Sequence, residues 1–172
     1  MANLDILIGR TAIANRVAEL GQQISADYAG SELLVVGVLT GAFVFTADLI
    51  RALDLPLAVD FIRVASYGEA TCSSGNICLT KDLECQVAGR HLLLVEDIVD
   101  TGRTLAWLQA HLLARNPASL KLCALIDKRE RREVVVAVDY VGFPVAEGFL
   151  VGYGLDCGGR YRQLQDICHL RP

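Results

Sequence analysis

The sequence predicts an α/β protein with a doubly wound, mainly parallel sheet that is flanked by helices. Continuous apolar runs indicate three strands, at residues 33–39, 92–95 and 120–126. Runs that are apolar on both faces are typical of parallel strands covered by helices on both sides. Helix-like segments at residues 43–53 and 101–115 separate these runs, and this alternation of strand and helix predicts the doubly wound arrangement.

Local patterns predict the elements around these strands. A helix before the first apolar run is indicated by apolar residues at helical spacing, which are Ile13, Val17, Leu20 and Ile24. Gly30 ends that helix, and residues 57–64 have the composition of a further strand. Residues 66–75 are small and polar and include two glycines, so they predict a mobile surface loop, with a plain hairpin connection as the alternative.

The chain after Lys128 departs from the alternating pattern. Short strand-like segments at residues 134–138, 142–144 and 149–153 predict a small hood subdomain, formed mainly by the C-terminal segment from about residue 128 onward. The chain has 172 residues and no linker rich in Pro, Gly or Ser, so we expect one domain over residues 1–172.

Composition and charge limit the classes of function. Hydrophobic residues make up 53% of the chain, which is ample for a core and argues against disorder. The net charge of −4 argues against broad binding of nucleic acid, while a local basic patch stays possible in principle. The first residues show no signal peptide, and the longest apolar stretch, residues 33–45, is shorter than the roughly 20 residues of a membrane span. We therefore expect a cytoplasmic protein that does not associate with membranes.

Three acidic residues follow the apolar run at residues 92–95. Glu96 and Asp97 come directly after it, and Asp100 comes after two apolar residues. Ligands of doubly wound sheets bind beyond the carboxyl ends of the strands. The three carboxylates are therefore expected where a ligand would bind.

The next four residues open a helix and predict an anion site; they are Thr101, Gly102, Arg103 and Thr104. Free backbone N–H groups and the helix dipole favour a phosphate here, and Gly102 allows the backbone to approach it closely. Acidic residues beside a phosphate fit a ligand that also carries hydroxyl groups and a metal ion. A phosphorylated ribose with Mg²⁺ meets these demands, because Mg²⁺ prefers oxygen ligands and bridges to phosphates. The alternative is an acidic turn in which Asp100 or Thr101 merely caps the helix.

One segment, from Val95 to Thr104, resembles the phosphoribosyl diphosphate (PRPP) binding motif of type I phosphoribosyltransferases. The resemblance extends from Leu33 to Arg162 and points to the hypoxanthine-guanine branch of that family. It implies the type I phosphoribosyltransferase fold and an enzyme of purine salvage that transfers the phosphoribosyl group of PRPP to hypoxanthine or guanine. It also implies Mg²⁺ as the cofactor, small-molecule substrates as partners, and a homodimer or homotetramer.

The resemblance assigns roles around PRPP. The PRPP contacts would come from Glu96, Asp97, Asp100, Thr101, Gly102, Arg103, Thr104, Leu39, Thr40, Gly41 and Arg162. Asp100 would be the catalytic base that takes the proton from N7 of the purine. The metal ligands would be Glu96, Asp97 and Asp156. The family often has a cis peptide in its diphosphate loop, which would fall between Leu39 and Thr40.

Further residues would recognise the base and close the site. Lys128 would bind the 6-oxo group of the purine and so disfavour adenine, whereas composition alone would leave it solvated in the charged run 128–132. We expect the other residues of that run to stay solvated. The remaining purine contacts would come from Phe149, which stacks on the base, and from Leu150 and Leu155. Ser66 and Tyr67 would begin a loop that closes over the site.

The sequence departs from the family pattern at a few positions. Thr40 stands where some members have lysine, Ala42 replaces a glycine, and residues 157–160 replace a more polar and aromatic segment.

Two alternative functions stay open. One is a phosphoribosyltransferase-like regulator that binds RNA through the basic cluster of Arg129, Arg131 and Arg132. The other is an enzyme that prefers xanthine and guanine, or adenine.

Overall fold

A central parallel sheet with one antiparallel edge strand organises the computed structural model, which describes residues 3–65 and 77–171. Its strand order is β4-β3-β2-β5-β6-β7. The strands are β2 (Leu33–Leu39), β3 (Leu57–Ala65), β4 (Cys78–Lys81), β5 (His91–Val99), β6 (Ser119–Lys128) and β7 (Tyr140–Val145). Only β4 runs antiparallel to its neighbour among these described strands. The predicted doubly wound, mainly parallel sheet is confirmed.

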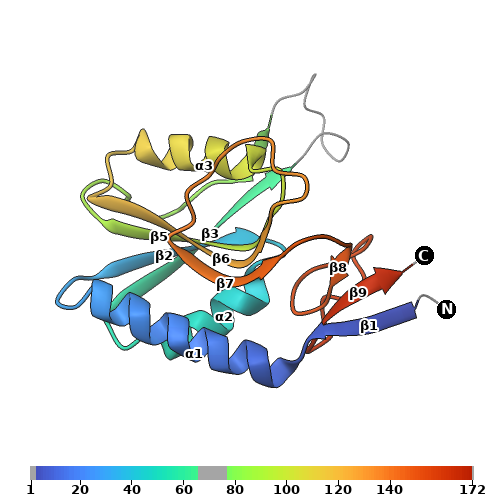
Figure 1. Cartoon of the computed structure of the whole chain (residues 1–172). Helices are drawn as coiled ribbons and strands as arrows, with labels where there is room; N and C mark the ends of the chain where they lie inside the picture. Colours follow the sequence, from blue (N-terminus) through green and yellow to red (C-terminus); the bar gives the residue numbers. More distant parts are fainter. Residues whose placement is uncertain (1–2, 66–76, 172) are drawn as a thin grey trace.

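Helices cover both faces of this sheet, as Figure 1 shows: α3 (Arg103–Leu113) lies on one face, and α1 (Arg10–Asp27) and α2 (Phe43–Ala52) lie on the other. Alternate strand residues point to opposite faces. The side chains packed with α1 and α2 include Leu33, Val35, Leu93 and Val95. Those packed with α3 include Leu34, Val36, Leu92 and Leu94. Continuous apolar runs form these strands because both of their faces are buried.

The predicted amphipathic helix is α1. Its buried face contains Ile13, Val17, Leu20 and Ile24, the four residues that indicated it. Gly21 lies on the same face, and a Cβ there would come within 2.5 Å of the Ala52 carbonyl oxygen. This close approach brings α1 against the end of α2 and fixes the helical layer under the sheet.

A second, smaller sheet has the order β1-β9-β8 and lies beside the central one (Figure 1). Its strands are β1 (Asn3–Ile8), β8 (Leu150–Val151) and β9 (Ile167–Arg171), and all its pairings are antiparallel. Both ends of the chain therefore meet in this sheet.

The chain after Lys128 differs from the sequence-based expectation in three ways. Residues 134–138 form no strand, residues 142–144 belong to β7 of the central sheet, and only Leu150–Val151 of the segment 149–153 is a strand. The strand β1 has no counterpart among the predicted elements. The second sheet thus combines β8 and β9 of the C-terminal segment with β1 from the start of the chain.

No helix within the described part of the chain is long and apolar enough to cross a membrane.

Candidate active site

The turn after β5 contains the predicted anion site. Glu96 and Asp97 lie near the carboxyl end of β5, which continues beyond the predicted end at residue 95 to Val99. Gly102 precedes α3 with a φ of +84°, and a Cβ there would come within 2.3 Å of the Val134 carbonyl oxygen. Glycine is therefore required by both backbone conformation and space.

A cavity of about 140 Å³ lies at the start of α3, lined by Glu96, Ile98, Asp100, Thr101, Gly102, Thr104 and Leu105. The first backbone N–H groups of a helix lack partners within the helix and attract anions. The first turn of α3 carries no acidic residue that would compete for them. We call residues 100–104 the phosphate turn, after the anion site that the sequence predicts there.

Two carboxylate oxygens in this cavity are buried without a hydrogen-bond partner in the described residues, namely Oε2 of Glu96 and Oδ1 of Asp100. Buried acceptors without a partner are costly and rare. The other oxygen of Asp100 lies 3.6 Å from Nη1 of Arg131. The unpaired oxygens are thus available to ligand hydroxyl groups or a metal ion.

Burial raises the pKa of Glu96 well above its usual value, and the neighbouring carboxylate of Asp97 raises it further. Burial also raises the pKa of Asp97, against the opposing effect of nearby donors that include the Ile98 N–H and Arg162. A cation bound here would favour the ionised forms of both groups. The electrostatics therefore fit a positively charged ligand component such as Mg²⁺.

The loop after β2 lies against Asp97. The peptide between Leu39 and Thr40 is cis, as the resemblance implies. A Cβ at Gly41 would lie 1.7 Å from Oδ2 of Asp97, so only glycine lets the loop approach this carboxylate. A Cβ at Gly154 would come within 2.2 Å of the Gly41 carbonyl oxygen, which packs a third segment behind the loop.

That third segment contains Asp156 and is tied to Arg162. Nη1 of Arg162 donates to the Gly154 carbonyl at 2.6 Å, and Nη2 lies 2.7 Å from Oδ1 of Asp156. Oδ2 of Asp156 accepts a hydrogen bond from the Gly159 N–H at 2.7 Å. Three described segments far apart in sequence thus meet around Asp97.

The predicted purine contacts have different surroundings. Lys128 ends β6 with only 7% of its surface exposed, and its Nζ lies 3.3 Å from Oε2 of Glu130. Phe149 is 54% exposed, so its ring is free to stack on a ligand. Leu150 and Leu155 are buried in the apolar core. Ser66 and Tyr67 lie outside the described residues.

Arg103 and Arg132 differ in exposure and in the ion pairs that they form. The Arg103 side chain is 69% exposed and pairs with Glu133 at 2.5 Å. The expectation that the run after Lys128 is solvated is wrong for Arg132, whose side chain is only 17% exposed and pairs with Asp127 at 2.6 Å. No sequence signal separates Arg132 from Arg129 or Arg131, because only the folded turn brings it against the ends of β5 and β6.

No three described Asp, Glu, His or Cys side chains gather closely enough to hold a metal by themselves. Mg²⁺ usually keeps several waters and takes one or two protein carboxylates together with substrate phosphates. The unpaired oxygen of Glu96 and the nearby Asp97 carboxylate fit such a site, which a phosphorylated ligand would complete.

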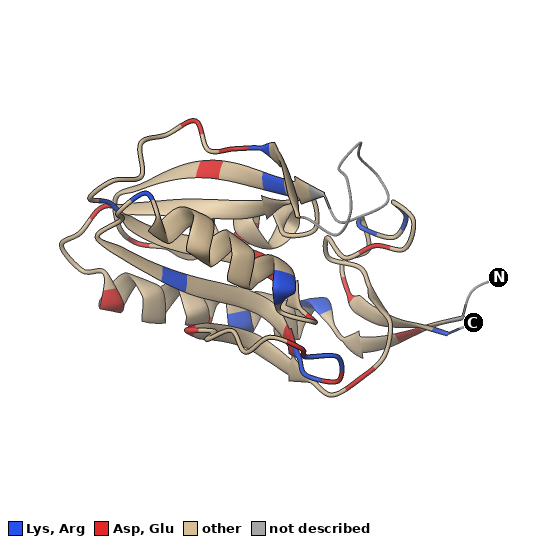
Figure 2. Cartoon of the chain, turned by 90° about the horizontal axis from the view of Figure 1, so that it is seen from above, with Lys and Arg blue, Asp and Glu red and all other residues tan. Residues whose placement is uncertain are grey.

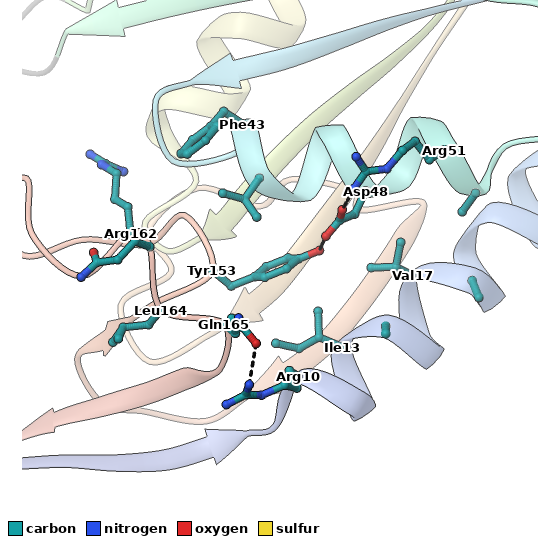
Figure 3. A pocket seen from close by; sticks show the side chains of 15 residues that line it. Arg10, Ile13, Val17, Phe43, Asp48, Arg51, Tyr153, Arg162, Leu164 and Gln165 are labelled. Carbon is teal, nitrogen blue, oxygen red and sulfur yellow. Dashed lines mark hydrogen bonds and ion pairs between the residues drawn. The ribbon is translucent and has the colours of Figure 1, made fainter.

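A larger cavity of about 580 Å³ lies between α1, α2 and residues 162–165 (Figure 3), and its lining includes none of Glu96, Asp97 and Asp100. Tyr153 donates to Asp48 at 2.5 Å across it, and Arg10 binds Gln165 at its edge. Its lining is mostly apolar, and its arginines Arg10, Arg51 and Arg162 are all paired with carboxylates. Of the predicted site residues that the structure describes, only Arg162 lines this cavity.

Comparison with known proteins gives a consistent result. The sequence profile of the phosphoribosyl transferase domain family matches residues 7–157. The hypoxanthine phosphoribosyltransferase of Haemophilus influenzae is 44% identical over 165 residues, covering 94% of this chain and 92% of that protein. The hypoxanthine-guanine phosphoribosyltransferase of Aquifex aeolicus is 46% identical, covering 95% and 93%. A crystal structure of a hypoxanthine-guanine phosphoribosyltransferase from Bacillus anthracis superposes with a TM-score of 0.90 at 42% identity, covering 97% of this chain and 98% of that one.

Proposed function

The chain belongs to the phosphoribosyltransferase family, and from this premise we propose that it transfers the phosphoribosyl group of PRPP to a 6-oxopurine. The products are IMP from hypoxanthine, or GMP from guanine, together with pyrophosphate. The names of its relatives agree with this activity. Its cellular role is purine salvage.

One structural observation carries the proposal. The phosphate turn places the first backbone N–H groups of α3 beside carboxylates whose buried oxygens have no partner among the described residues. A ligand with only a phosphate group would leave the carboxylate oxygens without a partner. A ligand with only hydroxyl groups would leave the helix N–H groups without an anion. A magnesium-bound ribose phosphate satisfies both halves of the site.

In the proposed mechanism, the N–H groups of the phosphate turn hold the 5′-phosphate, and Thr101 and Thr104 contribute hydroxyl groups. Glu96 and Asp97 accept hydrogen bonds from the ribose hydroxyls. The loop at residues 39–41 and Arg162 hold the diphosphate. Glu96 and Asp97 would hold one Mg²⁺, and Asp156 would help to hold a second Mg²⁺ together with the diphosphate; the bound ions would supply positive charge to the leaving diphosphate.

Asp100 acts on the purine in this mechanism. It takes the proton from N7 as N9 of the base attacks C1 of the ribose. Lys128 donates a hydrogen bond to the 6-oxo group, and Phe149 stacks on the ring. Leu150 contacts the edge of the base through its backbone, and Leu155 packs near it. Adenine lacks the 6-oxo acceptor and would leave the Lys128 ammonium without its partner.

The direct test is to incubate the protein with PRPP, Mg²⁺ and hypoxanthine, guanine, xanthine or adenine in turn, and to identify the nucleotide by chromatography. We expect IMP and GMP and no AMP. Exclusive formation of AMP would contradict the role of Lys128, and the absence of any nucleotide would contradict the proposed function itself.

The RNA-binding alternative has no support in the described residues. Arg129, Arg131 and Arg132 each pair with a carboxylate, on Asp127, Asp100 and Asp127 respectively. Figure 2 shows positive and negative residues interspersed along the ribbon.

A homodimer or homotetramer and a cytoplasmic location stay predictions from the sequence. Sedimentation would check the oligomeric state, and cell fractionation would check the location.

A further inference from the structure

The guanidinium of Arg132 joins the ends of two strands. Its Nε donates to the Asp100 carbonyl at 2.9 Å, and its Nη2 lies 3.0 Å from the Val99 carbonyl. The same Nη2 lies 2.6 Å from Oδ1 of Asp127 and 3.0 Å from the Lys128 carbonyl. Two acceptors thus belong to the end of β5 and the phosphate turn, and two belong to the end of β6.

The two strand ends carry different halves of the proposed site. Asp100 opens the phosphate turn, and Lys128 ends β6. The ladder between β5 and β6 reaches Val99 and Asp127, so the strands themselves do not fix Asp100 against Lys128. Arg132 supplies hydrogen bonds at the position where the ladder stops.

The environment of Arg132 makes this bridge strong. Its side chain is 17% exposed and the Asp127 side chain is 5% exposed, so the pair is shielded from solvent. Charge-assisted hydrogen bonds are roughly twice as strong as neutral ones, and a planar guanidinium can donate to several acceptors in fixed directions. Loss of Arg132 would leave buried backbone acceptors without a partner.

The neighbours of Arg132 in the charged loop, residues 129–133, also contact the site. The Glu130 carboxylate lies 3.3 Å from Nζ of Lys128, and Arg131 lies 3.6 Å from the carboxylate of Asp100. Backbone N–H groups of Glu133 and Val134 donate to the Thr101 carbonyl at 2.9 and 3.0 Å. The loop is therefore packed against both strand ends, and Arg132 is its buried anchor.

We propose that Arg132 is a positioning residue that holds the phosphate turn and Lys128 at a fixed separation, so that one ligand can engage both. This inference rests on the proposed function, because a nucleotide is the ligand that spans the two strand ends. Arg132 touches neither substrate; it acts through the Asp100 and Lys128 backbones.

The test compares the variants Arg132→Met, Arg132→Lys and Arg129→Met. We expect Arg132→Met to raise KM for both substrates and to lower kcat/KM by about 10- to 100-fold, the loss typical of a buried charge-assisted contact. Arg132→Lys should recover only part of this loss, because a lysine ammonium cannot donate to both strand ends in the guanidinium geometry. Arg129→Met is the matched control, since Arg129 pairs with the same Asp127 but is 80% exposed; it should stay within about twofold of the unsubstituted protein.

Calorimetric titration with GMP and with ribose 5-phosphate separates positioning from folding. A positioning role predicts full binding stoichiometry for Arg132→Met and a larger loss of affinity for GMP, which spans both strand ends, than for ribose 5-phosphate. Fewer binding sites with unchanged affinities would show a merely structural role and overturn the proposal. Unchanged kinetics of Arg132→Met, or full recovery by Arg132→Lys, would also overturn it.

The titration also distinguishes failure of this inference from failure of the proposed function. If the unsubstituted protein forms no nucleotide but binds GMP, the proposed activity is wrong and the affinities still decide the role of Arg132. If it binds no GMP, both proposals are wrong.

Discussion

Two acidic side chains at the end of β5 and in the phosphate turn are placed where the folded chain does not satisfy them. Glu96 and Asp100 each have a buried oxygen without a partner in the described residues, and burial raises the pKa of Glu96. A fold selected for stability alone would pair such oxygens or replace them. Their arrangement is typical of a functional site, where stability is lost so that a ligand can complete the contacts.

The proposed role of Asp100 leads to the first prediction. Asp100→Asn keeps the size of the side chain but removes its capacity to accept a proton at neutral pH. We expect kcat to fall by about 10²- to 10⁴-fold, the range for general acid–base catalysis, with the KM for PRPP changed little. Steady-state kinetics with hypoxanthine measure both values. Full turnover by this variant would contradict the assignment of Asp100 as the base.

The burial of Glu96 leads to a second prediction, on stability. A carboxyl group whose pKa is raised on folding favours the folded state at low pH, and this contribution is lost as the pH rises from the unfolded value of about 4.3 through the folded value. Glu96→Gln removes the ionised form. We therefore expect this variant to be more stable than the unsubstituted protein at pH 8, by about 1 to 2 kcal/mol, with a smaller difference near pH 4.

Urea denaturation at both pH values measures this difference, while calorimetry should show weaker binding of PRPP with Mg²⁺. Glu147→Gln provides the control, because Glu147 is an exposed carboxylate. A Glu96→Gln variant that is less stable at pH 8 would show that the ionised carboxylate is satisfied in the folded protein.

At the level of elements, a buried aspartate holds the pair of strands at one edge of the sheet. Asp60 on β3 is 8% exposed and accepts hydrogen bonds from the backbone N–H groups of Glu84 and Cys85, at 2.7 and 3.0 Å. Nζ of Lys81, the last residue of β4, lies 3.4 Å from the same carboxylate. Asp60 thereby fixes the segment that follows β4 against β3.

The third prediction concerns this carboxylate. Burial alone would raise the pKa of Asp60, but hydrogen bonds from the Cys85 thiol and three backbone N–H groups outweigh burial and hold the pKa well below its usual value. Its contribution to stability is therefore present above the unfolded pKa near 3.9 and is lost as the pH falls toward the folded value. Asp60→Asn should destabilise the protein at pH 7 by about 2 to 4 kcal/mol, and by progressively less below about pH 4.

Thermal or urea unfolding as a function of pH measures the effect of Asp60→Asn, with Asp54→Asn as the control because Asp54 is exposed. A destabilisation that is the same at pH 3 and pH 7 would mean that the ionised carboxylate is not what the N–H groups require.

Elements with a strong local signal were predictable. The strands β2, β5 and β6 are buried on both faces, so each appears in the sequence as a continuous apolar run. The helix α1 is buried on one face, so its apolar residues recur at helical spacing. The strand β1 was missed because it pairs with β9, more than 150 residues away, and leaves Ile6 66% exposed. Its stability comes from a partner that no local window contains.

The candidate site was predictable to a similar degree. The acids at the end of β5 and the phosphate turn form one contiguous motif, so their proximity follows from the sequence. The approach of Gly41 to Asp97, and of Arg132 to Asp100, depends on how separate segments pack. Arg132 stands in a run of similar charges, and only tertiary contacts make it differ from Arg129.

At the scale of the whole molecule, the proposed site lies between two sheets of different construction. The phosphate turn and Lys128 belong to the central sheet, whose strands β2, β5 and β6 are buried under helices. Leu150 belongs to the small sheet and Phe149 directly precedes its strand β8; this sheet has only short strands and exposes Ile6 and Leu7. Regions with fewer buried contacts open at lower free energy than the core.

The last prediction follows from this construction. In hydrogen exchange without ligand, we expect amides of β1 and β9 to exchange through openings of lower free energy than amides of β2, β5 and β6. GMP, which would contact both sheets, should slow exchange in β8 and β9 as well as in the phosphate turn. Ribose 5-phosphate should slow exchange in the phosphate turn alone, because it lacks the base that Phe149 would stack on. Equal protection of both sheets without ligand, or equal effects of the two ligands on β9, would show that the sheets open as one unit and that the base does not link them.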